Sequence, residues 1–248
     1  MSIESSQKIL EYVNRVAKVP LIVDGEPFGH KPPDKVTLKQ SFFLKDSCIM
    51  CGKCCPNETT AWTHEGYRRL LSEPHESFIK LGLNPGVRET VLSGIEETTI
   101  NVNGKDCLIW VHPADDKKIA NKLSWPDRAE TTRCHWLFER GGMHLCSIHP
   151  VRSITCGLPH VRFIYVGKTN HTTIGTTQFG RNFRLKCPIE FTELDEASVQ
   201  TKLLWLKRLN DCANDLGVPT FLPDIIQYLD AGGRHEVTFY PVPKRKLF

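Results

Sequence analysis

The feature that most constrains this chain is a dense run of cysteines between Asp46 and Pro56, which reads Asp-Ser-Cys-Ile-Met-Cys-Gly-Lys-Cys-Cys-Pro. Its thiols belong to Cys48, Cys51, Cys54 and Cys55. A Cys-x2-Cys step suits a loop that closes around one metal ion, and Gly52 gives such a loop the freedom for a sharp turn. Two successive steps bring three sulfurs toward one centre, whereas adjacent cysteines on a non-helical backbone point apart. The run therefore predicts either a multinuclear cluster or two neighbouring metal sites.

The cellular compartment decides whether cysteines bind metal or form disulfides, and the chain has 10 of them. Its first residues, Met-Ser-Ile-Glu-Ser-Ser-Gln-Lys, lack the basic and apolar regions of a signal peptide. No apolar run approaches the roughly 18 residues of a membrane span. We therefore expect a cytoplasmic protein with no membrane partner, whose thiols stay reduced and are available to a metal.

Composition and charge add weaker constraints. The 248 residues are 40% hydrophobic and 24% charged, which is ordinary for a globular protein. This length suffices for one large or two small domains with a real core. A formal net charge of +4 permits an acidic or nucleic-acid partner but does not require one.

We expect three regions along the chain. Residues 1–35 should form an N-terminal helix, with an apolar stripe through 3–16, followed by an irregular proline-rich arm over 20–33. Residues 36–190 should form a cysteine-cluster metal-binding domain. Residues 191–248 should form a C-terminal helical segment with a basic tail.

The expected fold class is α+β, with a small irregular core cross-linked by metal, short antiparallel hairpins, and helices at both ends. The predicted hairpins are 98–111 around Asn103-Gly104, 134–149 around Gly141-Gly142, and 160–177 around Lys168-Thr-Asn170. A strand is expected over 36–44, and an exposed loop over 113–133.

Apolar periodicity and capping residues predict the remaining helices. The predicted elements are helices at 63–71 and 75–81, a turn over 150–156, a helix after a capping box at Thr192 and Asp195 that stops at Gly217, a helix at 223–229, and an edge strand at 236–240. Cys107 lacks a close-spaced partner and Cys212 falls near an apolar helical stripe. We interpret both as buried apolar side chains.

Four further cysteines follow the first run, at Cys134, Cys146, Cys156 and Cys187. Together with Cys48-x2-Cys51-x2-Cys54-Cys55, they give a pattern that resembles the YkgJ-type family of CxxCxxCC proteins, described as zinc- or iron-chelating. The likeness covers residues 42–187. It implies that these eight cysteines are metal ligands.

The family's middle segment, Cys-x-Ile-Tyr-x-x-Arg-Pro-x-x-Cys, corresponds here to residues 146–156. The spacing, Ile148 and Arg152 agree with the family pattern. His149 stands in place of the tyrosine, and Ser153 stands in place of the proline.

The ligand pattern leaves two metals open. Three cysteines at x2 spacing plus a remote Cys187-Pro188 pair are similar to the ligand run of bacterial ferredoxins, which favours a [4Fe-4S] cluster or iron. Zinc is the alternative, because tetrahedral thiolate sets also suit this ion. Counting ligands suggests that a second site pairs Cys55 with Cys134, Cys146 and Cys156. Histidines that could serve as ligands or hydrogen-bond the ligands are His135, His144, His149 and His160.

Three functions are compatible with this pattern. The first is a metal centre in a structural or redox role, whose removal should abolish cooperative folding. The second is a metal-dependent methyl- or group-transfer enzyme, because a flagellin lysine N-methylase shares the cysteine-cluster style; the sequence identifies no catalytic residues for it. The third is a zinc-containing module that binds nucleic acid or protein through basic residues interleaved with aromatic ones. These residues are Arg128, Arg133, Arg140, Arg152, Arg162, Arg181, Arg184 and Lys186, with His160, Phe163, Tyr165, Phe179 and Phe183.

Overall fold

The computed structural model describes residues 20–23, 26–29, 32–45, 60–72, 92–112, 115–119, 131–133, 137–140, 143–146, 148–158, 161–176 and 193–241. Within them the fold is mixed α+β, with short and mostly antiparallel strands, so the predicted α+β class with short antiparallel hairpins is confirmed. The predicted helices over 3–16 and 75–81, and the basic tail after residue 241, lie outside the described residues.

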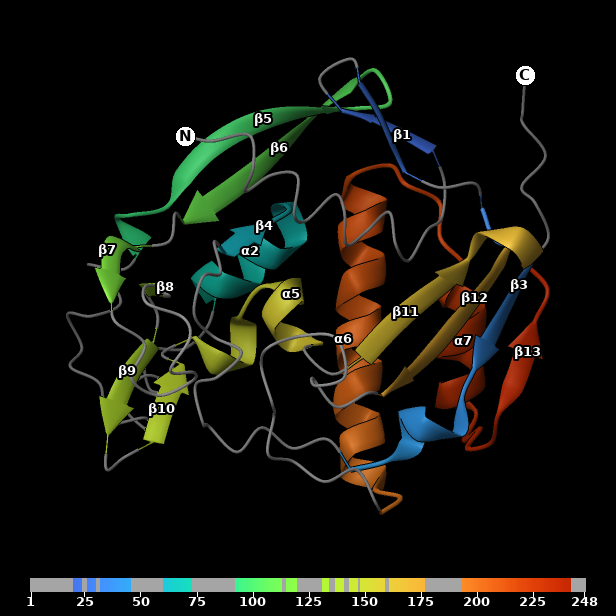
Figure 1. Cartoon of the computed structure of the whole chain (residues 1–248). Helices are drawn as coiled ribbons and strands as arrows, with labels where there is room; N and C mark the ends of the chain where they lie inside the picture. The colour runs from blue at the N-terminus through green and yellow to red at the C-terminus, as the bar shows by residue number, and fades with distance from the viewer. Residues whose placement is uncertain are drawn as a thin grey trace.

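A long helix, α6 (Glu196–Asp215), runs through the middle of the molecule (Figure 1). The Ser198 amide donates to Asp195 Oδ2 at 2.9 Å, so Asp195 is the N-cap. The helix stops before Gly217, whose φ of +67° suits glycine. The predicted helix and its end are confirmed, but the predicted capping box is wrong, because Asp195 caps the helix itself and Thr192 precedes it.

A four-stranded sheet and helix α7 (Leu222–Asp230) lie on one side of α6 (Figure 1). The strand order is β11-β12-β3-β13, with bounds Val161–Val166, His171–Thr176, Lys35–Leu38 and Val237–Phe239. The β11/β12 hairpin turns through η3 (Gly167–Thr169), and β3 pairs with β12 in parallel. The predicted hairpin, the edge strand β13 and helix α7 are confirmed. The predicted strand over 36–44 is too long, because the chain turns into η1 (Gln40–Phe43) after Leu38.

A second sheet has the strand order β2-β1-β5-β6-β4. Its strands are Glu26–Gly29, Pro20–Val23, Glu96–Val102, Lys105–His112 and Thr60–Trp62. The β5/β6 turn has φ of 52° at Asn103 and 82° at Gly104, as a two-residue hairpin requires. This prediction is confirmed. The buried residues of β5 and β6 belong to the same apolar core as those of α6.

Two predicted irregular segments are paired strands instead. Residues 20–33 contain the antiparallel β1/β2 hairpin, in which Pro27 lies opposite Ile22. Proline is tolerated there because β2 is the edge of its sheet. The expected loop over 113–133 contains β7 (Asp115–Ile119) paired with β8 (Thr131–Arg133), with an irregular register. Strand β7 begins with charged residues, so no alternation of apolar and polar side chains marks it as a strand in the sequence.

Short elements lie on the side of α6 that carries Cys146 and Cys156, which we call the cysteine-bearing region (Figure 1). These are α2 (His64–Ser72), β9 (Leu137–Arg140), β10 (Met143–Cys146), η2 (His149–Val151) and α5 (Ile154–Gly157). The predicted helix at 63–71 and the hairpin around Gly141-Gly142 are confirmed. The single turn predicted over 150–156 is divided into η2 and α5.

No helix in the described part of the chain is long and apolar enough to cross a lipid bilayer.

Candidate metal centre

The structure describes two of the predicted ligands, Cys146 and Cys156. The remaining predicted ligands lie outside the described residues: Cys48, Cys51, Cys54, Cys55, Cys134 and Cys187. Within the described ranges, no three or more His, Cys, Asp or Glu side chains form a group that could hold a metal ion. The geometry of the candidate centre is therefore built from residues 146–157, which we call the second cysteine segment.

Cys146 ends strand β10, where its backbone lies opposite Leu137 of β9. Its side chain is half-buried and packs against a small apolar cluster. The buried members of this cluster are Trp62, Leu70, Ile148 and Val151. The Trp62 indole donates to the Val151 carbonyl at 3.3 Å, which ties β4 to the second cysteine segment.

Cys156 lies on α5, and a hydroxyl group is directed at its sulfur. Ser153 Oγ donates to Cys156 Sγ at 3.5 Å, while the Cys156 amide donates to the Ser153 carbonyl at 3.1 Å. Ser153 is 1% exposed, so this donor is removed from water. A hydrogen bond of this kind restricts the orientation of the sulfur. The Ser153 hydroxyl is therefore a polar group placed next to a predicted ligand.

Arg152 connects the backbone of His149 to that of Cys156. Its Nε donates to the Cys156 carbonyl at 2.8 Å, and one terminal nitrogen donates to the His149 carbonyl at 2.6 Å. Its guanidinium carbon lies 4.8 Å from the centre of the Trp205 ring. Arg152 was predicted to contribute to a basic surface, but its guanidinium makes these internal contacts instead.

His149 is neutral at physiological pH in this setting. Burial lowers the pKa of its imidazole to about 4, and the nearby charge of Arg152 lowers it further in the same direction. Neutral imidazole is the form that binds metal, so the residue is compatible with the predicted role of ligand or ligand-supporting group. The other three predicted histidines have no described side chain: His135, His144 and His160.

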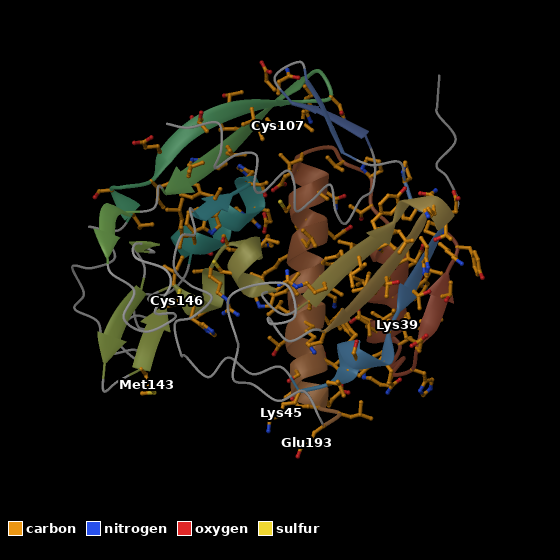
Figure 2. The ribbon with its side chains drawn as sticks, in the orientation of Figure 1. Lys39, Lys45, Cys107, Met143, Cys146 and Glu193 are labelled. Atoms are coloured by element: carbon orange, nitrogen blue, oxygen red, sulfur yellow. The ribbon has the colours of Figure 1, made fainter. Side chains whose placement is uncertain are left out.

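The chain segments next to the first cysteine run and next to Cys187 lie side by side at the foot of α6 (Figure 2). The Lys45 amide donates to the Glu193 carbonyl at 2.6 Å, and Leu44 forms an isolated bridge with Leu194. Residue 45 shortly precedes Cys48, and residue 193 shortly follows Cys187. These contacts connect two regions that are far apart in sequence and that both carry predicted ligands.

The other two described cysteines have a different environment. Cys107 and Cys212 are buried in the main apolar core. Burial raises the pKa of the Cys107 thiol, and it raises that of Cys212 to about 12. Both thiols stay protonated at neutral pH, which confirms their interpretation as apolar core residues.

The aromatic residues of β11 serve packing. Phe163 packs against the main core, and Tyr165 Oη donates to Asn170 Oδ1 at 2.8 Å. Alternation along the strand directs Arg162 to the opposite face from both. The interleaving of basic and aromatic residues here therefore reflects strand geometry. The predicted basic residues Arg128, Arg181, Arg184 and Lys186 lie outside the described ranges, and only the backbone of Arg133 and Arg140 is described.

Comparisons with known proteins find no match: no family model fits the chain, and no curated protein or solved structure is significantly similar to it.

Proposed function

We propose that this chain is a cytoplasmic metal-binding protein of the CxxCxxCC type, with a [4Fe-4S] cluster or iron favoured and zinc as the alternative. The proposed ligands are Cys48, Cys51, Cys54, Cys55, Cys134, Cys146, Cys156 and Cys187. An iron-sulfur cluster would supply electron transfer or redox sensing, whereas zinc would supply a structural cross-link. The role in either case is mainly structural or redox.

The observation that carries this proposal is the polar surroundings of Cys156. A buried hydroxyl donates to its sulfur, and an arginine holds the backbone of the same residue. Thr63 also hydrogen-bonds the Cys212 thiol, but Cys107 and Cys212 belong to the main apolar core, where burial raises their pKa values. Cys156 is not a member of that core, and its sulfur and backbone are both held by polar groups, as those of a metal ligand usually are.

Serine substitutions test the assignment. Cys156→Ser and Cys146→Ser should each reduce the metal bound per chain after anaerobic purification, since serine oxygen is a poor substitute for thiolate toward iron or zinc. Cys107→Ser is the matched control, because this thiol is buried in the core. Equal metal content in all three variants and the wild type would contradict the proposal.

A further inference from the structure

A small pocket lies where β4, α2, α5 and α6 come together (Figure 1). Its volume is about 20 Å³, which is room for one or two water-sized groups. The residues that line it include Arg69, Arg152 and Arg208, together with Trp62 and Trp205. We propose that this pocket binds the carboxylate group of a small organic acid, with Arg152 as the main residue that binds the anion. The inference goes beyond the proposed function and does not depend on a metal.

The charges around the pocket favour an anion. None of the described residues that line it is acidic. Arg69 is paired, because its Nη1 lies 3.1 Å from Asp211 Oδ2 and 3.6 Å from Glu65 Oε1. Arg152, by contrast, pairs with no carboxylate in the described part of the chain. The Cys212 thiol adds no negative charge, because burial raises its pKa to about 12. The pocket therefore contains a positive charge that an anion would balance.

The hydrogen bonds of Arg152 fix its guanidinium and leave donors available. Nε donates to the Cys156 carbonyl at 2.8 Å, and Nη1 donates to the His149 carbonyl at 2.6 Å. Among the described residues, Nη2 has no hydrogen-bond acceptor. Because a guanidinium has five N–H donors, both terminal nitrogens still offer an N–H group. Two parallel donors of this kind match the two oxygens of a carboxylate.

The Trp205 ring holds two guanidinium groups beside the pocket. The guanidinium carbons of Arg152 and Arg208 lie 4.8 Å and 4.4 Å from its centre. The ring is buried, and an added Cβ at Gly157 would overlap it, so it has little room to move. Arg208 is also held by a bond of 2.6 Å to the Pro150 carbonyl. Stacking orients a guanidinium without using its N–H donors. Donors held in place in this way lower the conformational cost of binding.

The size and charge of the pocket favour a carboxylate over a phosphate. The two oxygens of a carboxylate need about the space of two water molecules, whereas a phosphate group has more oxygens to place. One guanidinium without a counter-charge balances the single negative charge of a carboxylate. A phosphate monoester carries about −1.5 to −2 at neutral pH and would remain partly unbalanced. We therefore expect the carboxylate to occupy the pocket while the rest of the organic acid extends out of it.

The test titrates the full-length protein with sodium acetate at constant ionic strength and follows the indole N–H signals by ¹⁵N–¹H NMR. Trp62 and Trp205 line the pocket, so their signals should shift and reach saturation, with a Kd of about 1–10 mM. Trp110 is the internal control, because it is stacked on Tyr67 and is not among the residues that line the pocket. Its signal should shift less. Inorganic phosphate at the same ionic strength should bind more weakly than acetate.

Three variants assign the site to its residues. Arg152→Gln removes the charge that has no counter-charge, so acetate binding should weaken at least about tenfold. Arg208→Gln should weaken it several-fold, and this more exposed residue provides the test if Arg152→Gln does not fold. Lys207→Met is the matched control. It also removes one positive charge from α6, but from a surface ion pair with Asp230, and should leave acetate binding unchanged.

Several results would overturn the inference. Indole shifts that never saturate, or that are the same for acetate, phosphate and chloride, would show a general effect of salt. An equal loss of acetate binding in Lys207→Met and Arg152→Gln would show that only net charge matters. Tighter binding of phosphate than of acetate would overturn the assignment to a carboxylate. None of these readouts measures bound metal, so each result is independent of the proposed function.

Discussion

The region around α6 and the cysteine-bearing region are stabilised in different ways. The first has a continuous apolar core to which both sheets, α6 and α7 contribute. The second has a small cluster with four buried side chains among the described residues, together with hydrogen bonds from Arg152, Ser153 and Arg208. A small core provides little stability alone, so the second region is where a bound metal would add most.

Because of this difference, metal removal should abolish cooperative folding in only part of the molecule. The described members of the main core include Cys107 and Cys212 but neither Cys146 nor Cys156. We therefore expect the α6 region to unfold cooperatively even without metal, and the loss on stripping to be confined to the cysteine-bearing region.

The largest effect should come from the main core. Leu206→Ala removes a fully buried side chain, so it should lower the free energy of unfolding by about 2–5 kcal/mol. Leu204→Ala on the same helix is the control, because Leu204 is 47% exposed and should change this value little. Urea unfolding followed by circular dichroism measures both. Similar losses would show that α6 does not face the core as described.

The next effect is a dependence of stability on pH, which should arise from His149 in the cysteine-bearing region. The folded-state pKa of His149 is lowered from 6.5 to about 4, chiefly by burial, so the folded chain binds fewer protons than the unfolded chain between these values. Stability should therefore be complete above pH 6.5 and fall as the pH drops toward 4. In metal-free protein, His149→Gln should flatten this part of the curve of unfolding free energy against pH. An unchanged slope in this variant would show that His149 does not cause the loss of stability at low pH.

A smaller effect is expected from the donor to Cys156. Ser153→Ala removes a buried hydrogen bond worth about 1 kcal/mol, so zinc binding should weaken several-fold. Ser72→Ala is the matched control, because that hydroxyl is exposed and donates to the Arg69 carbonyl within its own helix. Competition with a chelator measures both variants, and equal affinities would show that the Ser153 hydroxyl does not support the sulfur.

The smallest effect should come from an exposed ion pair of the α6 region. The Arg234 hydrogen bond is the main cause that lowers the pKa of Glu196 to about 2, with Gln200 adding to it. A lowered carboxyl pKa gives stability above the unfolded value of 4.5, and this is lost as pH falls toward 2. Glu196→Gln removes the carboxylate and leaves the other bonds of Arg234 in place, so it should lower the urea midpoint slightly at neutral pH and leave it unchanged near pH 2. High salt should reduce the difference, because the pair is exposed.

Local sequence signals predicted much of the fold because they act over a few residues. Asn103-Gly104 fixes a two-residue turn wherever it occurs between strands, and Gly217 ends a helix through its own backbone preference. The pairing of β1 with β2 and of β7 with β8 escaped prediction, since proline and charge masked the alternation. Such pairs depend on partners that no local pattern reveals.

The sequence predicted candidate ligands for the site, but not the contacts that the structure shows around Cys146 and Cys156. The resemblance to the CxxCxxCC family singled out Cys146 and Cys156 as candidate ligands, because spacing alone marks only the run from Cys48 to Cys55. Other contacts come from Lys202, Trp205 and Arg208 of α6. These residues lie far along the chain, and their partners are backbone carbonyls and a stacked guanidinium. A lysine within an apolar helical stripe was the available signal, since such a residue is buried only when it has partners.

The central claim is that the chain binds metal through its cysteines, and one measurement tests it most directly. Protein purified without oxygen should be analysed for iron, zinc and acid-labile sulfide, with an absorption spectrum alongside. The account predicts about four irons with sulfide and a broad band near roughly 400 nm for a [4Fe-4S] cluster, or colourless protein with one or two zinc ions for the structural alternative. Protein that contains neither metal and takes up neither on reconstitution would contradict it.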